Sequence, residues 1–183
     1  RKKILKGAGL EFKTIPSSVD EELIKKKFNG KSYNFISKKL AQAKALEISK
    51  RFNNFFVIGA DQICVFKTKL LDKPLTKRNA IKQLTMLTGK EHKQISGFCV
   101  SYNDKIIFSS YEIAKLKMRN LSKKEIRSYV DFDSPLKSCG SYKFESKGYL
   151  LFSKIIGNHY TIQGLPILSL FNFLLKKNII GYD

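Results

Sequence analysis

Acidic residues are scarce in this chain. It has 15 Asp and Glu against 35 Lys and Arg among 183 residues, which gives a formal net charge of +20. Such a charge is compatible with binding to nucleic acid, to an acidic membrane surface or to a small polyanion such as a nucleotide. It is equally compatible with a lysine-rich composition, inherited from an AT-rich genome, on solvated surfaces. Charge alone therefore does not choose a function.

Histidine, cysteine and long apolar runs are scarce as well. His92 and His159 are too few and too separated to form a metal site without carboxylates. The three cysteines are odd in number and lack the close spacing of zinc ligands, so we expect reduced, mostly buried thiols. The longest apolar stretch, 165–175, is interrupted by polar residues and falls short of the roughly 20 residues that cross a bilayer. Since the basic start has no signal-peptide hydrophobic region, we expect a cytoplasmic protein without a membrane partner.

Apolar periodicity and turn residues predict strands and helices in alternation. We expect strands over 10–15, 55–58, 63–66, 93–102, 105–117 and 149–156. We expect helices over 33–51, over 79–87, from the S-x-x-E capping pattern of Ser122 and Glu125 onward, and from Pro166 onward. No repeat and no linker long enough to separate domains is present. The order predicts one α/β domain with a mixed sheet and helices on its faces.

A carboxylate directly follows an apolar run at Asp61. Residues 55–60 are apolar and lead into Asp61 and Gln62. An uncompensated charge at the edge of a core is costly, so Asp61 is a candidate for chemistry. Lys73, which follows a short second strand pattern, would return an ammonium near Asp61. The alternative for Asp61 is a hydrogen bond to a loop at the end of a strand.

Short motifs follow one another in a fixed order along the chain. They are V-D-E at 19–21, L-A-x-x-K-A at 40–45, G-A-D at 59–61, K-P at 73–74, S-G at 96–97, L-S-x-x-E-I-x-x-Y at 121–129, P-x-x-x-x-G-x-Y-x-x-E at 135–145 and G-L-P at 164–166. In this order and with these gaps, the chain resembles the Maf family of nucleoside triphosphate pyrophosphatases. The family's first strand and serine-containing loop have no counterpart before Arg1. We therefore expect one Maf-like nucleotide pyrophosphatase domain over 1–183 that is amino-terminally truncated.

The resemblance implies a fold, a reaction and a set of site residues. The fold is an elongated, ITPase-like sheet flanked by helices, with a smaller second lobe, a cleft between the lobes and a possible homodimer. The reaction is hydrolysis of a nucleoside triphosphate to the monophosphate and diphosphate with Mg²⁺ or Mn²⁺, which favour oxygen ligands. The resemblance assigns catalysis to Asp61, Lys73 and Glu21, metal binding to Glu21 and Asp61, and substrate binding to Arg1, Lys44, Gln62, Ser96 and Glu145.

Two of these residues indicate a substrate branch. Gln62 and Glu145 resemble the branch that acts on 7-methyl-GTP, where other members carry threonine and glutamine. A carboxylate at position 145 would favour a cationic 7-methylguanine ring electrostatically. Ser18, which replaces an aspartate of the other branch, and the missing loop are departures from the family pattern.

Other readings of the same residues stay open. Without the resemblance, Lys44 is a solvated charge on an amphipathic helix and Glu21 a helix N-terminal acid that the dipole favours. The net charge and the lysines at 25–27 and 38–39 near aromatic residues also fit a nucleic-acid-binding module, although no nucleic-acid-binding motif accompanies them. A catalytically silent regulatory protein with the same fold is the third alternative.

Overall fold

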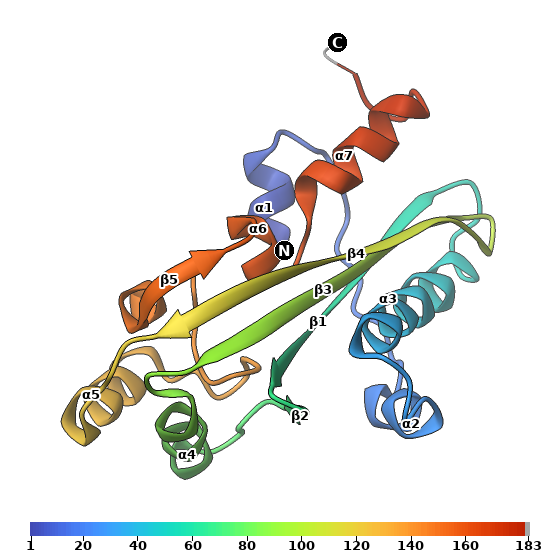
Figure 1. Ribbon diagram of the computed structural model, residues 1–183. Coiled ribbons are helices and arrows are strands. Elements are labelled where there is room, and N and C mark those ends of the chain that lie inside the picture. The colour runs from blue at the N-terminus through green and yellow to red at the C-terminus, as the bar shows by residue number, and fades with distance from the viewer. Residues whose placement is uncertain (182–183) are drawn as a thin grey trace. The chain divides into compact units, whose positions relative to one another are not determined.

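The computed structural model describes residues 1–181, which form a five-stranded sheet with helices packed against it (Figure 1). The strands pair in the order β2-β1-β3-β4-β5 and are β1 (Phe56–Phe66), β2 (Lys69–Leu71), β3 (Glu91–Tyr102), β4 (Lys105–Met118) and β5 (Phe152–Ile156). The helices are α1 (Lys2–Gly7), α2 (Glu21–Lys27), α3 (Tyr33–Ser49), α4 (Lys77–Leu87), α5 (Lys123–Asp133), the 3₁₀ helix η1 (Lys147–Leu151), α6 (His159–Ile162) and α7 (Ile167–Lys176). The predicted α/β class is confirmed.

Strand direction differs from the mixed sheet that the alternation of elements predicts. β1 pairs antiparallel with β2, and β4 pairs antiparallel with β5. β3 and β4 follow one another through Asn103 and Asp104, whose φ angles of 45° and 60° suit a tight hairpin turn. The hairpin is the predicted one. A hairpin needs two turn residues, whereas parallel neighbours need a long crossover, so short connections favour antiparallel pairing.

The chain divides into two compact units, each with its own core. Unit 1 contains Arg1–Gln62, Ser96–Glu112 and the chain from Gly164 onward, and unit 2 contains Ile63–Ile95 and Ile113–Gln163. The core of unit 1 contains Leu5 of α1, Ala60 of β1, Phe98 of β3 and Leu170 of α7, together with Leu165, which precedes α7. The core of unit 2 is larger and includes Leu84, Leu116, Ile126, Val130 and Tyr142.

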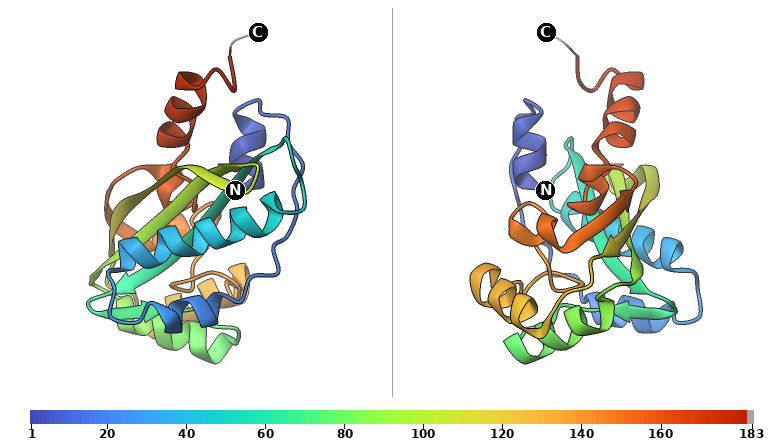
Figure 2. Two further views of the ribbon diagram at one scale, coloured as in Figure 1. Left: turned by 90° about the vertical axis from the view of Figure 1, so that its right-hand side faces the viewer. Right: turned by 60° about the vertical axis from the view of Figure 1, so that its left-hand side comes forward.

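In unit 1, helix α3 lies against the strands at unusually close range. Figure 2 shows α3 running across the strands on one face. At Gly59 of β1, an added Cβ would lie 2.8 Å from the Cβ of Ala45 and would collide with the carbonyl oxygen of Ala41. At Gly97 of β3, it would lie 2.7 Å from the backbone nitrogen of Lys38. Two glycines and the small residues of α3 thus bring the helix backbone down onto the sheet.

The two ends of unit 1 pack together. Figure 1 shows α1 beside α7, and Ile4 and Leu5 of α1 share the core with Leu170 and Leu174 of α7. Helix α7 begins directly after Pro166, as predicted, because proline is tolerated where no intrahelical N–H bond is needed. The first residues of the chain are therefore held by its last helix.

Unit 2 contains β2, β5 and the four remaining helices α4, α5, η1 and α6. Helices α4 and α5 pack against each other. Helix α5 begins with the predicted capping box: Ser122 Oγ accepts a hydrogen bond from the Glu125 N–H, and the Glu125 carboxylate accepts one from the Ser122 N–H. A reciprocal pair of this kind satisfies two amide groups that the first helical turn leaves without partners.

Four predicted strands are wrong in extent or in kind. Residues 10–15 are not a strand, and Phe12 and Ile15 stay 37% exposed, because apolar alternation does not by itself supply a pairing partner. The two short strands expected over 55–58 and 63–66 are one continuous strand, β1. The start of the strand expected over 149–156 is η1, and β5 begins only at Phe152.

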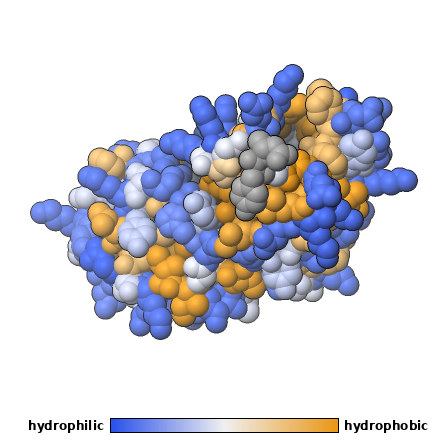
Figure 3. Space-filling model, turned by 90° about the horizontal axis from the view of Figure 1, so that it is seen from above, coloured by the Kyte–Doolittle hydropathy of each residue, from blue (hydrophilic) through white to orange (hydrophobic). Residues whose placement is uncertain are grey.

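Thiols and charge are distributed largely as expected. Cys64 and Cys99 are buried free thiols, whereas Cys139 is partly exposed, and burial raises the pKa of Cys99 to about 12. Hydrophilic side chains protrude over much of the surface in Figure 3, between patches of hydrophobic ones. Among the described residues, helices are too short or too polar to cross a membrane.

Candidate active site

Strand β1 carries Asp61 in its middle rather than at its end. Positions 59 and 61 lie on the same face of the strand, because successive strand residues point to alternate faces. That face is the one on which α3 packs, since Gly59 meets Ala41 and Ala45 there. Asp61 is only 5% exposed. A carboxylate is therefore buried beneath helix α3, within strand β1.

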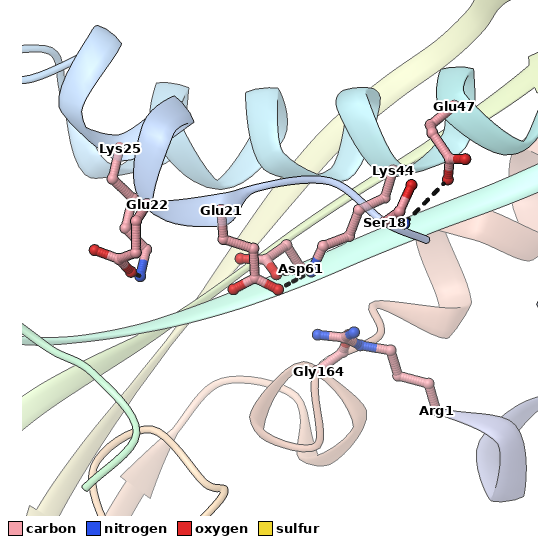
Figure 4. A network of polar contacts seen from close by, with 9 residues as sticks. All are labelled: Arg1, Ser18, Glu21, Glu22, Lys25, Lys44, Glu47, Asp61 and Gly164. Carbon is pink, nitrogen blue, oxygen red and sulfur yellow. Dashed lines mark hydrogen bonds and ion pairs between the residues drawn. The ribbon is translucent and has the colours of Figure 1, made fainter. Parts of the chain in front are cut away.

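Lys44 of α3 joins this carboxylate to a second one. Its ammonium Nζ donates to Asp61 Oδ1 at 2.6 Å and to Glu21 Oε1 at 2.7 Å (Figure 4). The side chain of Lys44 is 17% exposed, that of Asp61 7% and that of Glu21 30%. The reading of Lys44 as a solvated surface charge is therefore wrong. Three residues that are far apart in sequence form one ionic cluster within unit 1.

Glu21 reaches the cluster as the first residue of helix α2. Asp20 caps this helix by accepting a hydrogen bond from the Leu23 N–H at 3.0 Å, which fixes where the helix begins. The preceding segment is tied to α3, because the Ser18 N–H donates to Glu47 Oε2 at 3.3 Å (Figure 4). The V-D-E motif thus supplies the helix cap, Asp20, and the site carboxylate, Glu21, next to each other. Its valine directly follows Ser18, which is hydrogen-bonded to α3.

Arg1 is anchored at the G-L-P turn. Its Nε donates to the carbonyl oxygen of Gly164 at 2.9 Å. Gly164 has a φ of 94°, and an added Cβ there would lie 3.3 Å from Arg1 Nε and 3.4 Å from Gln62 Oε1. A side chain at position 164 would thus be strained and crowded, so glycine keeps Arg1 and Gln62 close.

Burial and the neighbouring charges shift the pKa of Asp61 in this cluster. Burial raises the pKa of Asp61 above its ordinary value, and the charge of Glu21 adds to this effect. Lys44 and Arg1 act in the opposite direction because a nearby cation favours the carboxylate form. An acid whose pKa is moved toward neutrality, yet which keeps cationic partners, is suited to accept a proton during a reaction.

The donor set fits a divalent cation. The Lys44 ammonium shows that one positive centre can contact both carboxylates at once, at 2.6 and 2.7 Å. Mg²⁺ commonly uses one or two protein carboxylates and completes its shell with phosphate oxygens and water. Among residues 1–181, groups of three or more His, Cys, Asp or Glu that could hold a metal do not occur. Glu21 and Asp61 would be the protein's own ligands.

The remaining predicted residues are distributed over both units. Ser96 is fully buried in the part of β3 that belongs to unit 1. Lys73 lies just after β2, and Glu145 lies in a turn before η1; both are exposed residues of unit 2. The structure thus brings together Arg1, Glu21, Lys44, Asp61 and Gln62 within unit 1. The catalytic and binding roles of all the predicted site residues, including those that lie together, stay predictions.

The G-A-D and G-L-P motifs contain two glycines, Gly59 and Gly164, whose packing role in this cluster sequence reasoning missed. Gly59 allows α3, and with it Lys44, to approach β1, and Gly164 holds the guanidinium of Arg1 through its carbonyl group. An isolated glycine inside an apolar strand pattern signals a close backbone approach, so Gly59 could have been found. Gly164 had no such local signal, because its partner is at the other end of the chain.

Comparison with known proteins identifies the family of this chain. The family model described as Maf-like protein matches residues 1–177. The chain belongs to this family. A relative from Legionella pneumophila (strain Paris), named nucleoside triphosphate pyrophosphatase, is 37% identical over 181 residues, which cover 99% of this chain and 90% of the relative. One from Aquifex aeolicus (strain VF5), named dTTP/UTP pyrophosphatase, is 37% identical over 181 residues, covering 99% and 92%.

Proposed function

We propose that this Maf-like chain hydrolyses a nucleoside triphosphate between its α and β phosphates, releasing a nucleoside monophosphate and diphosphate. It would then be a hydrolase that acts on acid anhydrides. The observation that carries the proposal is the cluster of Glu21, Lys44 and Asp61. In it the Lys44 ammonium contacts Asp61 at 2.6 Å and Glu21 at 2.7 Å. Family membership and the names of the Legionella and Aquifex relatives support the same reaction.

The predicted site residues each have a task in this proposal. Cleavage of a triphosphate requires charge neutralisation and an oriented water molecule. Asp61 accepts a proton from the attacking water. Lys44, Lys73 and Arg1 bind phosphate oxygens, the lysines as point charges and the arginine through its planar fork. Gln62, Ser96 and Glu145 contribute to substrate binding.

Glu21 and Asp61 would also hold a bound Mg²⁺ or Mn²⁺. When present, the ion neutralises charge on the phosphate oxygens. The two tasks of Asp61 compete, because a carboxylate that binds a cation is a weaker base. The pH dependence of turnover at several metal concentrations separates them. A proton-accepting Asp61 keeps its acidic limb in kcat at saturating metal, whereas a limb that comes only from metal binding moves to lower pH as the metal concentration rises.

The preferred base is a finer part of the proposal. Gln62 and Glu145 favour 7-methyl-GTP, since a carboxylate at position 145 would stabilise a cationic ring. The Aquifex relative, named for dTTP and UTP, is the reason to test pyrimidine nucleotides as well. A substrate panel with 7-methyl-GTP, GTP, dTTP, UTP and CTP, scored by kcat/KM, decides between them. Glu145→Gln should lower the ratio of 7-methyl-GTP to GTP if Glu145 reads the methylated base.

Diphosphate release by the purified chain, with Mg²⁺ or Mn²⁺ and each nucleotide, tests the function itself. Release of diphosphate in equal amount to the monophosphate supports it. Salt-sensitive binding to RNA or DNA without any hydrolysis would instead favour the nucleic-acid-binding alternative. The absence of both hydrolysis and such binding would favour a silent regulatory protein. Sedimentation of the same sample measures whether the chain is a homodimer, which we include in the proposal.

A further inference from the structure

The Lys44 ammonium contacts two carboxylates. Nζ lies 2.6 Å from Asp61 Oδ1 and 2.7 Å from Glu21 Oε1, which are the two acids proposed above as ligands of a divalent ion. A lysine that binds phosphate in the proposed function is thus drawn to acids of the same site. This arrangement raises the question of where Lys44 goes when substrate and metal are present.

The ammonium and a divalent ion compete for one position. A cation that contacts oxygens of both Glu21 and Asp61 has to lie between them, as Nζ does in Figure 4. Mg²⁺ takes such oxygens at about 2.0–2.1 Å. A like charge in the same space is strongly repelled, and the carboxylate oxygen atoms that Lys44 holds are withdrawn from coordination.

We propose that Lys44 is a resident cation of this site, which leaves the two carboxylates when a divalent ion binds and then binds a phosphate oxygen. This inference rests on the proposed function and adds a coupling between metal and phosphate binding. The release needs no backbone movement, since lysine carries its charge on a flexible four-carbon stem. Its side chain is 17% exposed, so the stem has access to solvent.

The burial of the acids explains why a resident cation is present at all. Asp61 is 7% exposed in its side chain, and two carboxylates this close would repel each other without a positive charge between them. Lys44 keeps the pair ionised and in place before substrate arrives. By thermodynamic reciprocity, a phosphate that attracts Lys44 away must strengthen metal binding, and metal must strengthen phosphate binding by the same factor.

Mn²⁺ titration of the full chain at pH 8.5, without nucleotide, tests the competition. Lys44→Met should bind Mn²⁺ at least tenfold more tightly than the wild type, because the resident cation is gone. Lys44→Arg keeps the positive charge and should stay within about threefold of the wild type. The double variant Glu21→Gln with Lys44→Met should lose the gain, which assigns it to this carboxylate pair. Inorganic pyrophosphate should increase the Mn²⁺ affinity of the wild type by a larger factor than that of Lys44→Met.

Two readouts keep the test decisive. Isothermal titration gives the affinity, and the rise of the unfolding midpoint with Mn²⁺ gives it independently, because a ligand of the folded state stabilises that state. If Lys44→Met does not fold, Lys44→Gln replaces it as a shorter neutral variant. Mn²⁺ affinity that is unchanged or weaker in the neutral variant overturns the inference, as does a gain that survives Glu21→Gln. A wild type that shows the predicted competition but releases no diphosphate would refute only the proposed function.

Discussion

Each unit contains a buried polar cluster, but the two clusters differ in charge. In unit 1, Lys44 and Asp61 are ionised partners with partial access to solvent. In unit 2, the groups are formally neutral: His92 Nε2 lies 2.8 Å from Tyr142 Oη, and Gln94 Nε2 donates to the same oxygen at 2.7 Å. His92 and Gln94 are each 2% exposed. The comparison separates a cluster built around charge from one built around packing.

The difference indicates what each cluster contributes. Charges are retained near a core at a high cost in desolvation, so an ionic cluster there is more informative about function than about stability. The neutral cluster costs less, yet within the described residues His92 Nδ1 and Gln94 Oε1 lack hydrogen-bond partners. Substitutions in the ionic cluster should therefore change turnover, and substitutions in the neutral cluster should change the free energy of unfolding.

The largest expected effect is on catalysis by Asp61→Asn. The amide keeps the size of the side chain but does not accept a proton at neutral pH, and loss of a general base lowers the rate by about 10² to 10⁴. Diphosphate release measures the rate. Glu47→Gln is the matched control, because Glu47 is a carboxylate of the same unit that pairs with Arg51 at 3.1 Å and accepts a hydrogen bond from Ser18. It should keep near-wild-type turnover.

Folding has to be followed in the same Asp61→Asn sample. Lys44 retains Glu21 as a partner in this variant, so the thermal unfolding midpoint should change by only a few degrees. An unfolded variant would mean that the ionic cluster holds unit 1 together. Near-full turnover would mean that another group accepts the proton. Either result would remove the distinction between the two clusters.

The second effect is a pH dependence of stability that arises in unit 2. Burial lowers the pKa of His92 from its ordinary value of 6.5 to about 4. Between these values the unfolded chain binds a proton that the folded chain does not, so the free energy of unfolding falls as the pH drops from about 6.5 to 4. The full contribution is about 3 kcal/mol, at roughly 1.4 kcal/mol per pKa unit. Urea unfolding at several pH values measures it.

Replacement of each histidine isolates this contribution. His92→Gln should flatten the pH dependence between 6.5 and 4, whatever its effect on stability at pH 8. His159→Gln, at the exposed second histidine, is the matched control and should not remove the slope that His92 produces. A slope that persists in His92→Gln would show that carboxylates, rather than the buried imidazole, dominate acid unfolding.

The sequence predicted the parts of the fold that depend on local patterns. The β3–β4 hairpin follows from two turn residues between alternating runs, and the capping box of α5 from Ser122 and Glu125. Segment 10–15 failed because a strand needs a partner, which a local pattern does not reveal. Of the site, the motifs found Glu21, Lys44 and Asp61 individually. Their joint ionic contact depends on the close approach of α3, which is a tertiary property.

The third prediction concerns Gly59, where a larger residue would disrupt the close approach of α3 to β1. In Gly59→Ala the new methyl group would collide with the carbonyl oxygen of Ala41 and lie 2.8 Å from the Cβ of Ala45. Overpacking of this kind costs roughly 1 to 3 kcal/mol, and the displaced α3 would carry Lys44 away from Asp61. The free energy of unfolding, measured in urea, and the rate of diphosphate release should therefore both decrease. Gly7→Ala is the control, since a Cβ there meets nothing within 4 Å. Equal stability of the two variants would contradict the packing argument.

The smallest expected effect concerns a helix cap that each unit possesses. Ser122→Ala in unit 2 removes the acceptor of the Glu125 N–H, and Ser32→Ala in unit 1 removes the acceptor of the Phe35 N–H. Each should cost about 1 kcal/mol in urea unfolding. Turnover separates the pair: Ser32→Ala frays the helix that carries Lys44, so its kcat/KM should fall slightly more than that of Ser122→Ala. The opposite order would mean that the far end of α3 does not depend on its cap, because packing on Gly59 and Gly97 alone positions Lys44.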